Sequence, residues 1–223
     1  DGAAVTAIRT AATSGAASDA LANPDASQLA IIGSGTQARS HFHAMCVVRP
    51  IQLARFFAPN RRKLEDLVSG LETDVEVQIV DSSVRATRDA DIICTTTNSS
   101  VPVIDDEAVR PGCHINAIGS YRPEVVEIPG KTIVRSRVYV DHRATALAEA
   151  GDLIQPLRRG EMDESDLVGE IGELFVGKIE GRTAGSQITL FKSVGNTVED
   201  VVAASAIVKN AARLGLGQEI SLH

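Results

Sequence analysis

Short apolar runs alternate with polar, helix-compatible segments along most of this chain. The first run, over residues 29–32, ends in a glycine-rich turn, and a polar segment over residues 36–48 follows it. Short apolar runs bounded by turn residues are typical of strands, whereas apolar positions three or four residues apart are typical of helices. We therefore expect strands over residues 29–32, 51–57, 75–80, 91–97, 114–118, 137–140 and 187–191.

Helices are expected between these strands and at both ends of the chain, over residues 3–22, 36–48, 60–69, 82–89, 144–150, 166–176 and 197–214. The helix over residues 144–150 is expected to stop at Gly151, and Asn196 is expected to cap the last helix. In that last helix the residues expected to face a core are Val198, Val201, Val202, Ser205 and Val208. Strands that alternate with helices in this way predict an α/β fold with a doubly wound parallel sheet, whose ligand lies at the carboxyl ends of the strands.

Composition supports a globular chain of this class. The chain has 223 residues, enough to bury a sizeable core, and 43% of them are hydrophobic but only 3% aromatic, which suits the aliphatic interior of a parallel sheet. A net charge of −7 argues against a nucleic-acid partner, and no apolar run approaches the roughly 18 residues of a membrane span. The three cysteines lack metal-site spacing, and Cys94 and Cys113 lie in apolar runs, so we expect buried thiols in a reducing compartment and a cytoplasmic location.

The first strand ends in the sequence Gly33-Ser34-Gly35-Thr36-Gln37-Ala38. Strand, glycine turn and helix are the context in which G-x-G-x-x-A indicates dinucleotide binding. The first glycine permits the tight turn, the second lets a diphosphate approach the backbone, and the alanine lets the helix pack on the strand. The free N–H groups at the start of that helix then face the diphosphate. The alternative is a turn that needs glycine for its geometry alone.

The end of the second expected strand indicates which dinucleotide binds. NAD sites usually place an acidic residue roughly 20 residues after the glycine turn, to hold the ribose hydroxyls. Here that position falls in Asn60-Arg61-Arg62-Lys63, and no carboxylate occurs before Glu65. Guanidinium groups suit a 2′-phosphate, so NADP is the expected cofactor and NAD the alternative. These cations could also be solvated charges at the start of a helix.

Several segments together resemble the ornithine cyclodeaminase/mu-crystallin family. They are DG with TAIRTAA, IIGSGTQA, NAIG, VYVD and FKSVG, at residues 1–2, 6–12, 31–38, 116–119, 138–141 and 191–195. They occur in the family's order over essentially the whole chain. The resemblance implies a helix of a substrate and dimerisation domain over residues 1–22, a Rossmann domain over 23–185, and a strand and helix that return to the substrate domain over 186–223. It also implies that the chain lacks most of that second domain, so we expect a fragment or a truncated product, and a homodimer at full length.

The resemblance also implies roles for single residues. Arg9 matches an arginine near the substrate carboxylate and the cofactor phosphate, which makes it more than an ordinary surface charge. The turn Gly33–Gln37 matches the pyrophosphate site, and Asn60 and Arg61, with Arg62 beside them, match the 2′-phosphate site. The remaining expected cofactor contacts are Thr95, Thr96 and Thr97 beside the ribose, and Ala117, Ile118, Gly119 and Ser193 on the nicotinamide side.

One departure from the family pattern indicates the subfamily. True ornithine cyclodeaminases carry a catalytic aspartate two residues after the glycine that Gly119 matches, whereas this chain has Tyr121 there. Cyclodeamination needs a base at the imine carbon, and tyrosine, with a pKa near about 10, is a poor one. The resemblance therefore favours the mu-crystallin and alanine dehydrogenase branch. We expect an NADP(H)-dependent oxidoreductase that transfers a hydride to the C=N bond of a small, cyclic imino acid, with Arg9 and Tyr121 as catalytic residues.

Three alternatives stay open from the sequence: an NAD-dependent ornithine cyclodeaminase, an alanine dehydrogenase, and a mu-crystallin-like protein that binds NADPH and a small ligand without turnover. No metal site is expected, because His41 and His43 do not share a helix face and are expected to be exposed or partly buried. His114 is expected to be structural. Asp141 and His142 are adjacent, but adjacency in sequence does not make a catalytic pair.

Overall fold

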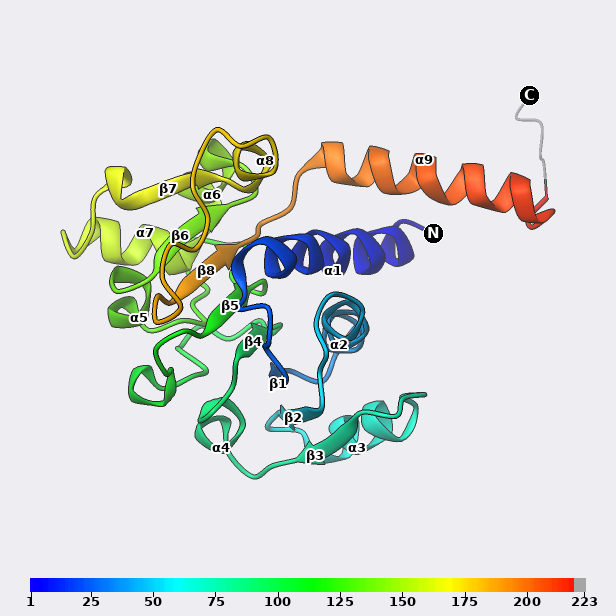
Figure 1. Ribbon diagram of the computed structural model, residues 1–223, viewed down its shortest axis with the longest axis horizontal. Helices are drawn as coiled ribbons and strands as arrows, with labels where there is room; N and C mark the ends of the chain where they lie inside the picture. Colours follow the sequence, from blue (N-terminus) through cyan, green and yellow to red (C-terminus); the bar gives the residue numbers. More distant parts are fainter. Residues whose placement is uncertain (219–223) are drawn as a thin grey trace.

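The computed structural model describes residues 1–218, and its centre is one sheet of eight parallel strands (Figure 1). The strand order across the sheet is β3-β2-β1-β4-β5-β8-β6-β7. The strands are β1 (Gln28–Ile32), β2 (Leu53–Phe57), β3 (Glu76–Ile79), β4 (Ile92–Thr95), β5 (His114–Ala117), β6 (Arg137–Val140), β7 (Leu167–Glu170) and β8 (Thr189–Lys192). Helices cover both faces, so the expected doubly wound α/β fold is confirmed.

The helices fill the connections between the strands. They are α1 (Gly2–Leu21), α2 (Thr36–Val48), α3 (Arg61–Ser69), α4 (Ser83–Thr87), α5 (Gly130–Val134), α6 (Arg143–Glu149), α7 (Gly151–Arg158), α8 (Ile171–Phe175) and α9 (Thr197–Leu214). Side chains of α2 and α3 share one core with β1, β2 and β4, and those of α4 to α7 share another with the opposite face of the sheet. No helix in residues 1–218 is both long and apolar enough to cross a membrane.

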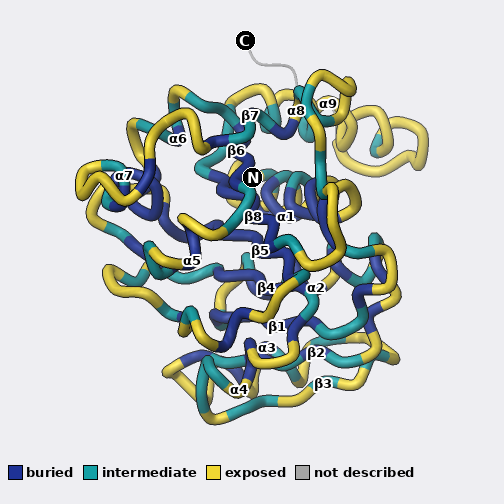
Figure 2. Tube along the Cα trace, turned by 60° about the vertical axis from the view of Figure 1, so that its left-hand side comes forward, coloured by how far each residue is buried: buried dark blue, intermediate teal, exposed yellow. Residues whose placement is uncertain are grey.

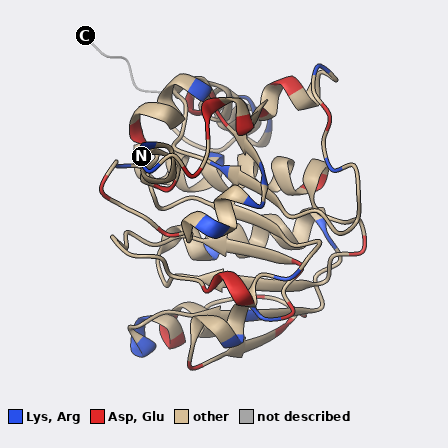
Figure 3. Ribbon diagram, turned by 90° about the vertical axis from the view of Figure 1, so that its left-hand side faces the viewer, with Lys and Arg blue, Asp and Glu red and all other residues tan. Residues whose placement is uncertain are grey.

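Burial follows the position of each strand in the sheet. The central strands β4, β5 and β8 are buried at every position, whereas the edge strand β3 alternates between exposed and half-buried positions. Figure 2 shows the buried positions concentrated along the middle of the sheet. Figure 3 shows the charged residues mostly on the helices and connecting loops around a largely uncharged sheet. This is the pattern of a parallel sheet covered by helices on both faces.

Helix α1 packs closely on α2, as its small side chains predict. A side chain at Gly15 would lie 3.6 Å from Ala44 and 3.7 Å from Val48, so the helices meet at this glycine. His41 of α2 is fully buried against α1, where its Nε2 lies 2.9 Å from the hydroxyl of Ser14. The expectation that this histidine is exposed or partly buried was therefore wrong, because α1 covers the face of α2 that carries it.

Three local expectations also differ from the structure. Residues 166–176 were expected to form one helix, but Leu167–Glu170 form β7 beside β6, and only Ile171–Phe175 are helical. A new helix, α7, begins at Gly151, where a stop was expected. The expected core face of α9 is exposed: the valines at positions 198, 201, 202 and 208 are 63–67% exposed. The first and third expectations depended on local periodicity and the second on a glycine stop signal, and neither signal shows the packing partner.

Candidate functional site

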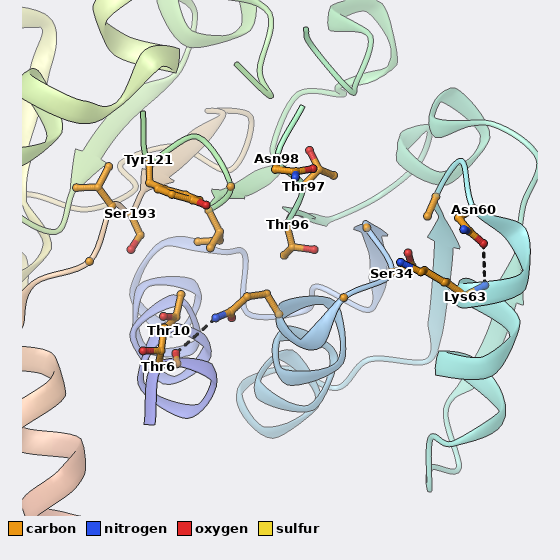
Figure 4. A pocket seen from close by; sticks show the side chains of 18 of the residues that line it. Thr6, Thr10, Ser34, Asn60, Lys63, Thr96, Thr97, Asn98, Tyr121 and Ser193 are labelled. Atoms are coloured by element: carbon orange, nitrogen blue, oxygen red, sulfur yellow. Dashed lines mark hydrogen bonds between the residues drawn. The ribbon is translucent and has the colours of Figure 1, made fainter. Parts of the chain in front are cut away.

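A cavity of about 650 Å³ lies at the carboxyl ends of the central strands, between α1 and the start of α2. It brings together most of the residues expected to bind cofactor or substrate. Those that line it are Arg9, Gly33, Ser34, Gly35, Gln37, Asn60, Thr96, Thr97, Ile118, Gly119, Tyr121 and Ser193. In Figure 4, Tyr121 and Ser193 lie at one end, Asn60 and Lys63 at the other, and Thr96 and Thr97 between them. The cavity is therefore elongated along the strand ends.

Five expected site residues do not line this cavity. Thr36 and Arg62 lie beside lining residues, and the guanidinium of Arg61 binds the carboxylate of Glu65 at 2.8 Å on the surface of α3. Thr95 and Ala117 are fully buried at the ends of β4 and β5, where they support the loops that do line the cavity.

The two glycines of the turn after β1 are glycine for different structural reasons. Gly33 has φ +137°, a conformation that side chains rarely adopt, and a side chain there would collide with Thr96. Gly35 has φ −99° and ψ −173°, which any residue adopts, and no protein atom lies within 4 Å of the position that its Cβ would take. The fold therefore requires glycine at position 33, whereas the space beside Gly35 is open to a ligand.

The open space beside Gly35 lies at the N-terminus of α2. Helix α2 begins at Thr36 and has Gly35 as its N-cap. Its first N–H groups have no acceptor within the helix, and the helix dipole favours negative charge there. Open space beside Gly35, next to unpaired N–H groups, fits the diphosphate of a dinucleotide.

The far end of the cavity carries a cation and a polar side chain from the start of α3. Asn60 caps this helix, with its side-chain oxygen accepting a hydrogen bond from the Lys63 N–H at 3.0 Å. Both Asn60 and Lys63 line the cavity. A second hollow, of about 830 Å³, adjoins this end and shares Pro59, Thr97 and Asn98 with the first. The side chains around it include Val84 and Val101, an apolar lining that suits a flat aromatic base.

Arg9 reaches the opposite end of the cavity from α1. Its Nε binds Asp200 at 2.9 Å and its Nη1 binds Glu199 at 3.1 Å, both from the first turn of α9. Burial, and repulsion from Asp141, raise the pKa of Glu199, while Arg9 opposes that shift. A guanidinium has five N–H donors, so these two ion pairs leave donors for a further anion.

Ser193 and Asp141 form one hydrogen-bonded unit beside Arg9. The Ser193 hydroxyl donates to Asp141 Oδ2 at 2.9 Å, and the backbone N–H groups of Val194 and Gly195 donate to the same oxygen at 2.8 and 2.6 Å. His142 has another task, since its Nδ1 lies 2.8 Å from the Thr145 hydroxyl at the start of α6. Asp141 therefore holds the loop after β8, and does not form a catalytic pair with its neighbour.

Tyr121 is an exposed ring at the site, with 48% of its surface accessible. It follows β5 by way of Gly119, whose carbonyl accepts a hydrogen bond from the Tyr121 N–H at 3.1 Å. The guanidinium of Arg122 lies 5.5 Å from the centre of its ring, at cation–π distance. The phenol lies at the cavity mouth, where it is able to contact a small substrate.

Sequence reasoning missed several residues at this site. Thr6 and Thr10 line the cavity from α1, and their spacing of four residues on one helix face was a usable signal. Glu127 lies buried behind the cavity, and its place within the apolar stretch 125–128 was the only local hint. Within residues 1–218, no group of three or more His, Cys, Asp or Glu side chains is arranged to hold a metal ion.

Comparisons with known proteins agree with this geometry. The sequence model of the ornithine cyclodeaminase/mu-crystallin family matches residues 1–214. A Delta(1)-pyrroline-2-carboxylate reductase from Bacillus cereus is 36% identical over 223 residues, which cover 99% of this chain and 68% of the relative. The chain therefore spans about two thirds of that relative's length.

Two solved structures are similar over 98% of this chain and 68% of their own. One is the Delta(1)-pyrroline-2-carboxylate reductase of Thermococcus litoralis in complex with NADH and L-proline, with a TM-score of 0.94 and 34% identity. The other is an archaeal alanine dehydrogenase dimer with bound NAD, with a TM-score of 0.90 and 30% identity.

Proposed function

The chain belongs to the ornithine cyclodeaminase/mu-crystallin family, and from that premise we propose that it is an NAD(P)H-dependent imino-acid reductase. The substrate we propose is a small cyclic imino acid, Δ1-pyrroline-2-carboxylate or a close analogue, with the corresponding L-amino acid as the product. One observation carries this proposal. A single cavity joins the glycine turn, with open space at Gly35 for a diphosphate, to an arginine, Arg9, at one of its ends.

The cofactor part of the proposal rests on the turn and on both ends of the cavity. The diphosphate would lie against Gly33–Gly35 and the start of α2, and the adenosine would lie toward Asn60 and the hollow near Val84. When bound, the reduced dinucleotide supplies the hydride. Lys63 lines the cavity where a ribose 2′-phosphate would lie, which supports a preference for NADP(H).

The substrate part rests on Arg9 and Tyr121. The free N–H donors of Arg9 would hold the imino-acid carboxylate, while Glu199 and Asp200 fix the direction of its guanidinium. In the reduction a hydride reaches the imine carbon, and the electron pair of the C=N double bond moves onto the protonated nitrogen, which becomes an amine. That amine then takes a proton from water to form the ammonium. The Tyr121 phenol would line the substrate side of the cavity.

The direct test measures reductase activity of the protein with Δ1-pyrroline-2-carboxylate. Loss of the near-ultraviolet absorbance of NADPH or NADH is followed, and L-proline is identified by mass spectrometry. We expect turnover that depends on both substrate and cofactor. Binding of NADPH without turnover would instead support the ligand-binding alternative, and ammonia released from ornithine with catalytic NAD would support cyclodeaminase chemistry.

Assembly and location complete the proposal. We propose that the full-length protein acts as a homodimer, which is supported by the alanine dehydrogenase dimer of similar fold. We also propose a cytoplasmic location, which is supported by the free thiols Cys46, Cys94 and Cys113. Sedimentation of the full-length protein and cell fractionation test these two statements separately.

A further inference from the structure

Glu127 is a fully buried glutamate that lies behind the cavity and is not among its lining residues. Its carboxylate accepts three hydrogen bonds from the ends of two neighbouring strands. Oε2 accepts from the Thr95 hydroxyl at 2.9 Å and from the Gly119 N–H at 2.6 Å, while Oε1 accepts from the Thr97 N–H at 2.5 Å. One side chain therefore joins the loop after β4 to the loop after β5.

These two loops meet at an unusually close contact. A side chain at Gly119 would collide with the Thr97 carbonyl oxygen and come within 2.7 Å of Glu127 Oε1. Thr97 and Gly119 both line the cavity, between the glycine turn and Tyr121. The carboxylate of Glu127 thus holds together the two backbone segments that form this part of the cavity wall.

The core near Glu127 holds one buried cation and a second buried carboxylate. Lys192 of β8 is also fully buried, and its Nζ donates to the Ala117 carbonyl at 2.8 Å and lies 3.4 Å from Asp152 Oδ2. The Asp152 Oδ1 atom in turn accepts from the Glu127 and Ile128 N–H groups at 2.8 and 3.0 Å. Burial, together with repulsion from the Asp152 carboxylate, raises the pKa of Glu127, and the Lys192 ammonium opposes that shift.

Two backbone N–H groups, those of Thr97 and Gly119, require an acceptor at each oxygen of the Glu127 side chain. A carboxylate has only acceptors, whereas the amide of glutamine places an NH2 donor at one of the two positions. A donor at Oε1 would face the Thr97 N–H, and a donor at Oε2 would face the Gly119 N–H. Leaving a buried donor without an acceptor costs more than the hydrogen bond itself contributes.

We propose that Glu127 is a positioning residue for the reductase. Its carboxylate sets the separation of the Thr97 and Gly119 loops, and through it the shape of the cofactor wall on the nicotinamide side. This inference rests on the proposed function, because it gives Glu127 a task in cofactor binding. Glu127 does not touch the cavity, so its effect on catalysis passes entirely through the two loops.

The test compares Glu127→Gln with Glu149→Gln, a matched change at the exposed end of α6. Binding of NADH is measured by its fluorescence, KM and kcat are measured with the imino acid, and hydrogen exchange is followed by peptide. For Glu127→Gln we expect the NADH Kd to rise about tenfold and kcat to fall, with the imino-acid KM changed less than about threefold because Arg9 lies on α1. Exchange should accelerate in peptides that contain Thr97 and Gly119, and not in those from α2.

Each outcome decides a stated point. Native NADH affinity together with native exchange in both loops would overturn the positioning role. Exchange that accelerates evenly through the sheet would overturn it as well, because Glu127 would then only stabilise the fold. If the native protein reduces no imino acid, the proposed function fails, yet the loop exchange and the NADH binding of the variant still decide the task of Glu127.

Discussion

Replacement of Gly35 by alanine should separate cofactor binding from folding, because the added methyl group would meet no protein atom. Apart from Gly35 and its two chain neighbours, no protein atom lies within 4 Å of that Cβ position, and the backbone angles of Gly35 are open to any residue. Alanine reduces the entropy of the unfolded chain, which stabilises by about 0.4–1 kcal/mol. Alanine is also a poorer N-cap than glycine, by less than about 1 kcal/mol. These two effects nearly cancel, so the free energy of unfolding should change by under about 0.5 kcal/mol.

The effect on cofactor binding should be much larger. The methyl group would occupy the space in which a diphosphate approaches the N–H groups at the start of α2. A hydrogen bond to a charged group contributes roughly 1.5–3 kcal/mol. Loss of one or two such bonds raises the dissociation constant by roughly tenfold to more than a hundredfold.

Gly33→Ala serves as the contrasting variant. Gly33 has φ +137°, and its methyl group would collide with Thr96, so this change should destabilise the fold as well as the site. The assay combines urea denaturation with fluorescence titration of NADH for both variants. If Gly35→Ala binds NADH within about threefold of the native protein, the diphosphate does not lie at this turn. If it unfolds as easily as Gly33→Ala, the distinction between the two glycines is wrong.

Three further predictions concern the two ends of the cavity and the buried histidines. Arg9→Ala should lower kcat/KM for the imino acid by about a hundredfold or more, since charged hydrogen bonds to the substrate are lost. The melting temperature of this variant should fall by only a few degrees, because the partner carboxylate of Asp200 is 43% exposed. Parallel losses of activity and stability would contradict the substrate role. Lys63→Ala should raise the KM for NADPH about tenfold and change the KM for NADH little. Arg61 is paired with Glu65 on the surface, so Arg61→Ala should leave both KM values nearly unchanged. Steady-state kinetics with both cofactors test this, and the opposite behaviour of the two variants would place the 2′-phosphate elsewhere. Burial lowers the pKa of His41 to about 4 and that of His114 to about 3. Below about pH 6.5 the unfolded chain therefore binds more protons than the folded chain, and the free energy of unfolding should fall by roughly 1 kcal/mol per histidine between about pH 7 and about pH 5.5. Urea denaturation of His41→Gln should show about half of this pH dependence.

Most of the sheet could be predicted from local sequence. The run 29–32 before the glycine turn, and the helix over 36–48 after it, lie where the pattern places them, because a strand that is buried on both faces needs an unbroken apolar run. The segment 166–176 shows the limit of this method. Its apolar spacing is compatible with a helix, but a place at the edge of the sheet beside β6 made Leu167–Glu170 a strand.

Some features of the candidate site could likewise be predicted from local sequence, whereas others could not. The glycine turn was visible because its function depends on neighbours in the chain, and Arg9 was visible through its motif. The partners of Arg9 were not, since Glu199 and Asp200 lie about 190 residues away along the chain. The direction of the α3 cations was also hidden: Lys63 lines the cavity, whereas Arg61 binds Glu65 on the surface.

The sequence by itself determined the fold class, the family and the dinucleotide turn, because each depends on residue types at short, regular spacing. Only the tertiary structure decided that β8 lies between β5 and β6, and that Glu127 joins the loops after β4 and β5. The physical reason is that the neighbours of a strand and the partners of a buried charge depend on how the whole sheet and its helices pack. Such contacts leave no periodic signal in the segments that make them.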